Sequence, residues 1–140
     1  MGTIAEVDLA IRITEEMLAS IPTNNPSRVT YLNHLHSALQ RRFQKAGLKD
    51  DLDRILTVQE EVIACLSNDT LQQGISLGNL AYWLQKRFEM TRSMEDIDRA
   101  IATNRHALRL LPNDHPSRGE CFNYLGICLG FRFKQTMAAR

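Results

Sequence analysis

The chain has 140 residues, is 44% hydrophobic, and carries 17 Lys and Arg against 16 Asp and Glu, a formal net charge of +1. Nucleic-acid-binding proteins usually present a clearly basic face, so this balance argues against a nucleic-acid partner. No apolar run reaches the roughly 18 residues that would suggest a membrane span. The N-terminus lacks the basic and apolar segments of a signal peptide, so we expect a soluble, cytoplasmic protein.

Six helices with short connections are predicted, and no segment shows the alternation of a strand. The first carries an apolar stripe from Val7 to Ile21 and is ended by Pro22, because proline cannot continue the hydrogen bonds of a helix. Asn25 is predicted to cap the second helix, with Pro26 at its first position, and Gly47 to end it.

The remaining helices follow similar signals. The third is predicted to begin at Asp50 or Asp51, the fourth near Thr70 and the fifth at Ser93–Asp96, and the sixth follows Pro116. The apolar stripes expected along the six helices are Val7, Ala10, Ile11, Thr14, Met17, Leu18 and Ile21; Leu32, Leu35, Leu39 and Phe43; Leu52, Ile55, Leu56, Gln59, Val62, Ile63 and Leu66; Leu77, Leu80, Leu84 and Phe88; Ile97, Ala100, Ile101, Ala107, Leu108 and Leu111; and Phe122, Leu125, Leu129 and Phe133.

A period of 45 residues organises the chain, as Leu35, Leu80 and Leu125 illustrate. A fixed period of this size indicates stacked supersecondary units. Two antiparallel helices cannot bury both of their stripes alone, so neighbouring units are expected to stack. We therefore predict one domain over residues 1–140, made of about three 45-residue units that are cut within a unit at both ends.

The period also relates charged residues near the predicted turns. Arg42 is expected to pair with Asp53, and Arg87 with Asp98, across short hairpin turns. Exposed pairs of this kind contribute under about 1 kcal/mol, so we interpret them as structural. Asp8 has no upstream arginine at the matching place, and Arg132 has no downstream aspartate.

A second repeated set is polar and lies on the apolar stripes of the shorter helices: Thr14, Gln59 and Asn104. Buried polar side chains need partners. We expect hydrogen bonds to backbone carbonyls, with contact to a ligand as the alternative.

No arrangement of residues typical of catalysis or metal binding is present. The four histidines include no pair four residues apart, and no cysteine or carboxylate completes a zinc set. Cys121 and Cys128 are seven residues apart on one predicted helix, about 10 Å along its axis, which is too far for a disulfide. With Cys65 they are expected to be reduced and mostly structural. We predict no enzymatic activity, no cofactor and no metal site.

The small residues and closing prolines of these units resemble those of tetratricopeptide repeats. Ala81 and Gly126 match the small position of the family's first helix; Ala100 and Ala107, with Pro112, match its second helix and closing proline, as do Ala10 and Pro22. His36, Ile55, Val62 and Ser67 depart from the pattern. The family's period is about 34 residues, so the longer period here is similar to that of large fungal multidomain proteins, in which such repeats accompany a caspase-like peptidase domain or a nucleotide-switch domain.

This resemblance implies an all-α, right-handed α-solenoid of stacked antiparallel helix hairpins, and a scaffold function in which a concave groove binds a protein or peptide. The alternative is a sensor or regulatory segment of a larger signalling protein with one of those two domains. The groove predicted from the family lies on the longer helices and comprises Asn33, Ser37, Gln40, Arg41, Tyr82, Gln85, Lys86, Asn123, Ile127 and Phe131. Ile127 and Phe131 add apolar surface to the last helix, which predicts a homodimer or the continuation of a longer array.

Overall fold

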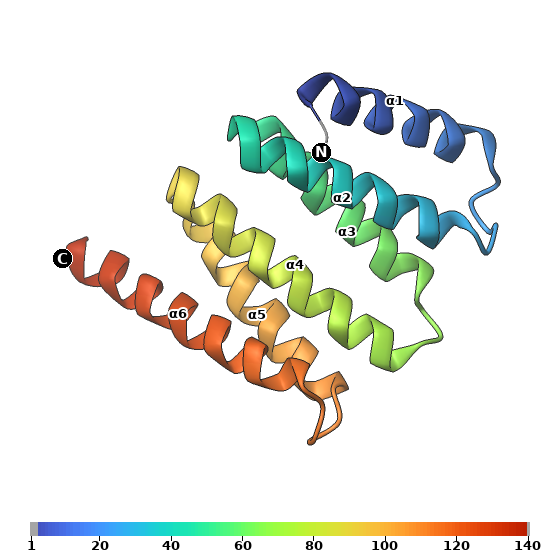
Figure 1. Ribbon diagram of the computed structural model, residues 1–140. Helices are drawn as coiled ribbons and strands as arrows, with labels where there is room; N and C mark the ends of the chain where they lie inside the picture. The colour runs from blue at the N-terminus through green and yellow to red at the C-terminus, as the bar shows by residue number, and fades with distance from the viewer. Residues whose placement is uncertain (1–2, 140) are drawn as a thin grey trace. The chain divides into compact units, whose positions relative to one another are not determined.

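The computed structural model describes residues 3–139 and forms six α-helices over them, with no strand, which confirms the predicted all-α class (Figure 1). The helices are α1 (Ile4–Ser20), α2 (Arg28–Ala46), α3 (Lys49–Cys65), α4 (Thr70–Thr91), α5 (Met94–Leu110) and α6 (Ser117–Ala138). The short helices α1, α3 and α5 have 17 residues each, whereas the long helices α2, α4 and α6 have 19, 22 and 22.

The helices form two compact units, unit 1 (Met1–Cys65) and unit 2 (Leu66–Arg140). Unit 1 contains a long helix, α2, packed against the short helices α1 and α3. Unit 2 contains a short helix, α5, packed against the long helices α4 and α6, and α4 also contacts α6. Consecutive helices within each unit run antiparallel (Figure 1). No helix of residues 3–139 is both long and apolar enough to cross a membrane.

Several helix ends are defined by local capping. Thr3 and Glu6 form a reciprocal capping box at the start of α1. The Asp69 side chain accepts a hydrogen bond from the backbone N–H of Gln72 at the start of α4. Gly47 ends α2 with a φ of 65°, in the left-handed region that glycine adopts without steric cost, as predicted for this position.

Two predicted helix starts are wrong by one or two residues. The second helix, α2, begins at Arg28 rather than at Pro26, because the Asn25 side chain accepts a hydrogen bond from the Ser27 N–H and holds these residues in a turn. The third helix, α3, begins at Lys49, so that Asp50 and Asp51 lie inside its first turn, where acidic side chains suit the helix dipole.

The buried apolar residues follow the predicted stripes through most of the chain, with the exceptions described below. In unit 1 they are Val7, Ile11, Leu18, Leu32, Leu35, Ala38, Leu39, Leu52, Ile55, Leu56, Val58 and Val62. In unit 2 they are Leu77, Leu80, Ala81, Trp83, Leu84, Phe88, Ile97, Ala100, Ile101, Ala107, Leu111, Cys121 and Cys128. The burial of two of the three cysteines agrees with their predicted structural role.

The stripe predictions are wrong at both ends of the chain. Phe122 and Phe133 of α6 are 55% and 66% exposed, and Met17 and Ala10 of α1 are exposed as well. The face of α6 that is buried in unit 2 is the one that carries the two cysteines, and the two phenylalanines lie on another face. Parts of the apolar stripes on α1 and α6 are therefore exposed, although the period places a stripe on every helix.

The hairpins between a long helix and the following short helix are joined by arginine–aspartate pairs. The Arg42 guanidinium donates to Asp51 at 2.7 Å, and Arg87 donates to Asp96 at 2.7 Å. The partners are thus two residues earlier than predicted. Successive helical residues point about 100° apart, so Asp53, two residues beyond Asp51, points to a different side of α3.

Arginines of the long helices also reach the preceding short helix. Arg42 donates to Asp8 at 2.8 Å, and Arg132 donates to Asp98 at 3.4 Å. Each pair spans 34 residues. Asp8 has no upstream arginine and Arg132 has no downstream aspartate, but each is paired in the other direction along the chain.

A further repeated contact, missed in the sequence, lies at the turn between a short helix and the next long helix. Arg28 donates to the Leu18 carbonyl at 3.2 Å, and Arg118 donates to the Leu108 carbonyl at 2.6 Å. The last carbonyls of a helix have no partner within it, and a cation there also suits the helix dipole. The signal was available, because Arg28 and Arg118 are two periods apart.

The repeated polar residues on the short helices differ in their hydrogen bonds. The Thr14 hydroxyl donates to the Ala10 carbonyl of its own helix at 2.7 Å, so the predicted backbone hydrogen bond is confirmed there. Asn104 is 0% exposed, yet its side-chain nitrogen and oxygen have no hydrogen-bond partner among the described residues. The backbone hydrogen bond predicted for Asn104 is therefore wrong.

Candidate functional site

The largest described hollow of unit 1 lies between α1 and α2 and contains two of the predicted groove residues. It has a volume of about 540 Å³ and is lined by Ala10, Ile13, Thr14, His34, Ser37, Ala38 and Arg41. A smaller hollow of about 240 Å³ adjoins it and is lined by Glu6, Val7, Ala10, Ala38 and Arg41. Because the two share three lining residues, we treat them as one surface, the α1–α2 hollow.

The α1–α2 hollow has both apolar and charged lining residues. Its lining includes the small residues Ala10 and Ala38, and about half of Ile13 is exposed. Glu6 and Arg41 place one negative and one positive group at its edge. A segment with one apolar face and charges beside it would satisfy both parts of this surface.

The other predicted residues of α2, Asn33 and Gln40, do not line the α1–α2 hollow. Asn33 is exposed and Gln40 is half-buried. The α1 residues of the hollow were not predicted, because the groove inferred from the resemblance lies only on the longer helices.

In unit 2 the predicted groove residues of α4 and α6 contact one another or their neighbours. The Tyr82 ring lies 5.3 Å from the Tyr124 ring of α6, and the Lys86 ammonium lies 5.3 Å from the centre of the Tyr82 ring. The Phe131 ring of α6 packs 5.5 Å from the Phe88 ring of α4. These residues are therefore partly occupied in holding α4 against α6.

Gln85 is buried in the same contact, with 6% of its surface exposed. It accepts a hydrogen bond from the Cys128 thiol at 3.7 Å and donates to Glu89 at 3.4 Å. Burial, together with the nearby Glu89 charge, raises the pKa of Cys128 to about 11. Asn123 and Ile127 of α6 remain exposed, whereas Trp83 of α4 is buried.

The 45-residue period relates the α1–α2 hollow of unit 1 to the packing of α4 in unit 2. The α6 residues that hold α4, namely Tyr124, Cys128 and Phe131, lie two periods after the hollow residues His34, Ala38 and Arg41. The α5 residues two periods after Ala10, Ile13 and Thr14 are Ala100, Thr103 and Asn104. The α1–α2 hollow of unit 1 is thus the counterpart of the surface that α4 covers in unit 2.

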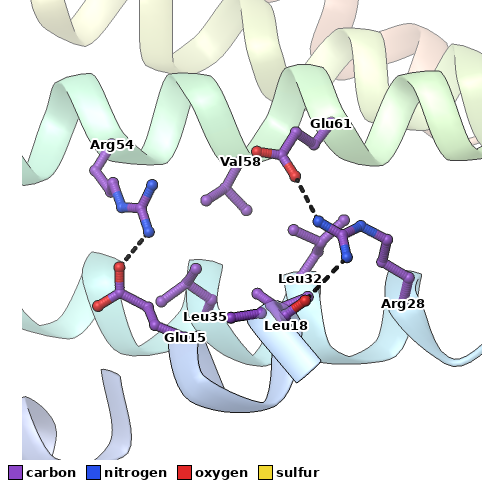
Figure 2. Close-up of a pocket in the computed structure, with 9 residues that line it drawn as sticks. Glu15, Leu18, Arg28, Leu32, Leu35, Arg54, Val58 and Glu61 are labelled. Atoms are coloured by element: carbon purple, nitrogen blue, oxygen red, sulfur yellow. Dashed lines mark hydrogen bonds and ion pairs between the residues drawn. The ribbon is translucent and has the colours of Figure 1, made fainter. Parts of the chain in front are cut away.

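A second, smaller hollow of unit 1 has a different character (Figure 2). It has a volume of about 150 Å³ and is lined by Glu15, Leu18, Ala19, Arg28, Leu32, Leu35, Arg54, Val58 and Glu61. Arg54 of α3 pairs with Glu15 of α1, and Arg28 lies 3.5 Å from Glu61. Since each charge faces an opposite charge across the hollow, we interpret it as a clamp that joins α1, α2 and α3.

Among the described titratable groups, His36 and Cys121 have pKa values shifted by burial. Burial lowers the pKa of His36 and raises the pKa of Cys121, so neither charged form is favoured. Over residues 3–139, no group of three or more His, Cys, Asp or Glu side chains is placed to hold a metal ion.

In unit 2, the surface that corresponds to the α1–α2 hollow is covered by the helix α4. Comparisons of the chain with protein-family models, with curated proteins and with solved structures found no match in any of the three.

Proposed function

We propose that this protein is a non-enzymatic interaction module that binds an amphipathic helix of a partner protein in the α1–α2 hollow. The observation that carries the proposal is the repeat relation between the two units. The same positions that form an open hollow on α1 and α2 hold α4 in unit 2 through the ring pairs Tyr82–Tyr124 and Phe88–Phe131.

The proposal includes a tetratricopeptide-like solenoid of stacked hairpins as the architecture. Its support is the recurrence of whole contacts, not only of residue types: the long-to-short hairpin pair recurs as Arg42–Asp51 and Arg87–Asp96. A scaffold of this kind binds partners along exposed helix faces. The exposed groove residues Asn33 and Asn123 would extend the binding surface beyond the hollow.

The features of the bound helix follow from the hollow. An apolar face with small residues would lie on Ala10 and Ala38, because those side chains leave room for close approach of a helix. A basic residue toward its C-terminal end would meet Glu6, as Arg42 meets Asp51 at the counterpart position. Helix-in-groove recognition of this type uses anchors at i, i+3 or i+4, and i+7.

The test uses a synthetic peptide with the sequence of α4, Thr70–Thr91, because α4 occupies the counterpart surface. We expect the fluorescently labelled peptide to bind the full chain saturably. Ala10→Glu, which adds a charged side chain to the lining of the hollow, should weaken binding at least about tenfold.

The matched control is Leu48→Glu. Leu48 is exposed and lies outside the hollow, so this variant should bind the peptide as the wild type does. Circular dichroism would verify that both variants keep their helicity. Equal affinities for wild type and Ala10→Glu, or no binding by the wild type, would refute the proposed site.

A further inference from the structure

The last helix exposes the face that the other long helix of its unit uses for packing. The α4 residues Leu77, Ala81 and Phe88 are buried, with Phe88 at 0% exposure. Their counterparts one period later, Phe122, Gly126 and Phe133, are all exposed on α6. Apart from its chain neighbours and its own helix backbone, a Cβ atom placed on Gly126 would meet no atom within 4 Å, so the helix surface is open to close approach there.

The first helix exposes the complementary face. In α5 the residues Asp96, Ala100 and Ala107 are buried, and Arg87 of α4 pairs with Asp96. Their counterparts two periods earlier on α1 are Glu6, Ala10 and Met17, and all three are exposed. Methionine is larger than the alanine of α5, but its flexible side chain adapts to an irregular partner surface.

The charges on the two exposed faces match as well. Arg42 has two acidic partners, Asp8 on the preceding short helix and Asp51 on the following one. Among the described residues, its counterpart Arg132 has only the first kind of partner, Asp98. Glu6 stands at the position of the second kind of partner.

The Glu6 carboxylate has few partners among the described residues. Over the described residues it accepts a hydrogen bond from the backbone N–H of Thr3 at 3.3 Å and makes no ion pair. The position that is buried and paired with arginine in α3 and α5 is thus solvent-exposed in α1.

We propose that α6 of one copy of this protein occupies the α1–α2 hollow of a second copy, with Arg132 paired to Glu6 of that second copy. The inference rests on the proposed function and names its partner. By the repeat relation, Phe133 of the first copy takes the place of Phe88 and lies over Arg41 of the second, where Phe88 lies on Phe131 within unit 2. An arginine over an aromatic ring is a favourable contact.

This contact joins two different surfaces, so it is heterologous. Each added copy covers one α6 face and one α1–α2 hollow and brings another of each, so association continues into longer chains or closes into a ring. A symmetric pairing of two α6 helices would cover the phenylalanines but would leave Glu6 and the hollow without a partner. The charge match therefore favours the head-to-tail arrangement.

The test uses two variants that each block one surface. Ala10→Glu blocks the hollow and leaves α6 free, whereas Phe133→Glu blocks α6 and leaves the hollow free. Both positions are exposed, so the fold should be retained. We expect the molar mass of the wild type, measured by light scattering over a concentration series, to rise with concentration, and each variant alone to remain at the mass of one chain.

Mixing the two variants gives the decisive result. The free α6 of Ala10→Glu should bind the free hollow of Phe133→Glu, so the mixture should form a 1:1 pair and no larger species. Leu48→Glu, the control, should assemble as the wild type does. Charge reversal offers a second test, in which Glu6→Arg and Arg132→Glu should each weaken assembly. Mixing the two variants should restore it, because whichever variant supplies α6, the contact between positions 132 and 6 then pairs an arginine with a glutamate.

Several results would overturn the proposal. A wild type that stays at the mass of one chain at all concentrations would do so. Dimers of Ala10→Glu alone would indicate α6–α6 pairing instead, and dimers of Phe133→Glu alone would indicate pairing through α1. If the mixture stays monomeric while Phe133→Glu still binds the α4 peptide, self-association is wrong and the proposed function stands; if that peptide does not bind either, both fail.

Discussion

Replacing Phe88 with alanine is expected to destabilise unit 2 far more than the same replacement of Phe133, although the two residues are one period apart. Phe88 is 0% exposed, packs 5.5 Å from the Phe131 ring and lies under the Arg92 guanidinium. Burial of such a side chain contributes about 1.5–3 kcal/mol, and the cavity left behind raises the total cost to about 3–5 kcal/mol.

Phe133 provides the matched comparison, because both residues are phenylalanines at the same repeat position of a long helix, whereas their burial differs. Two thirds of Phe133 is exposed, so only about a third of the transfer free energy is lost and no cavity forms. The expected cost is about 1 kcal/mol or less.

The assay is urea unfolding followed by circular dichroism, at protein concentrations low enough that no self-association contributes to the measured free energy of unfolding. The difference between the two variants should be about 2–4 kcal/mol. Equal losses for Phe88→Ala and Phe133→Ala would contradict both the burial assignment of α4 and the argument that α6 presents an uncovered face.

Three further outcomes are expected. Asn104→Leu should stabilise the protein by about 1 kcal/mol in urea unfolding, because the buried amide loses hydrogen bonds to water on folding and gains none; a loss of stability would mean that the amide has a partner. Burial lowers the folded-state pKa of His36, so below pH 6.5 the unfolded chain binds more protons than the folded chain. The free energy of unfolding should therefore fall as the pH decreases through that value. His36→Gln should remove this part of the pH dependence. At neutral pH iodoacetamide should modify exposed Cys65 first, and modify Cys128 only as the protein unfolds, because the pKa of Cys128 is raised to about 11; equal rates in mass spectrometry would argue against the buried thiol.

The sequence alone determined the local structure of this protein well. Proline, glycine and capping residues predicted six helices with ends within a few residues, since these signals act over one turn of chain. The 45-residue period predicted which positions recur, and Leu35 and Leu80, which are one period apart, are both buried as expected. Both kinds of inference depend on interactions between residues that are near in sequence, or on patterns that every unit shares.

Only the tertiary structure decided which of the equivalent positions are covered. Phe88 and Phe133 have the same place in the pattern, but one is buried and the other is exposed. Gln85, predicted to face a partner, is instead enclosed between α4 and α6. A periodic sequence places the same stripe on each helix, whereas burial requires a neighbouring helix on that side. The sequence pattern of one helix does not specify whether such a neighbour is present.

The pairing of charges shows the same division. The arginines at the ends of the long helices were evident, but the choice of Asp51 over Asp53 depended on where α3 begins, and a shift of two residues turns a side chain by about 200° around the helix. The partner of Asp8 was also decided in three dimensions, because Arg42 reaches it across 34 residues of chain. Contacts between helices depend on their relative rotation and packing, which no single helix determines.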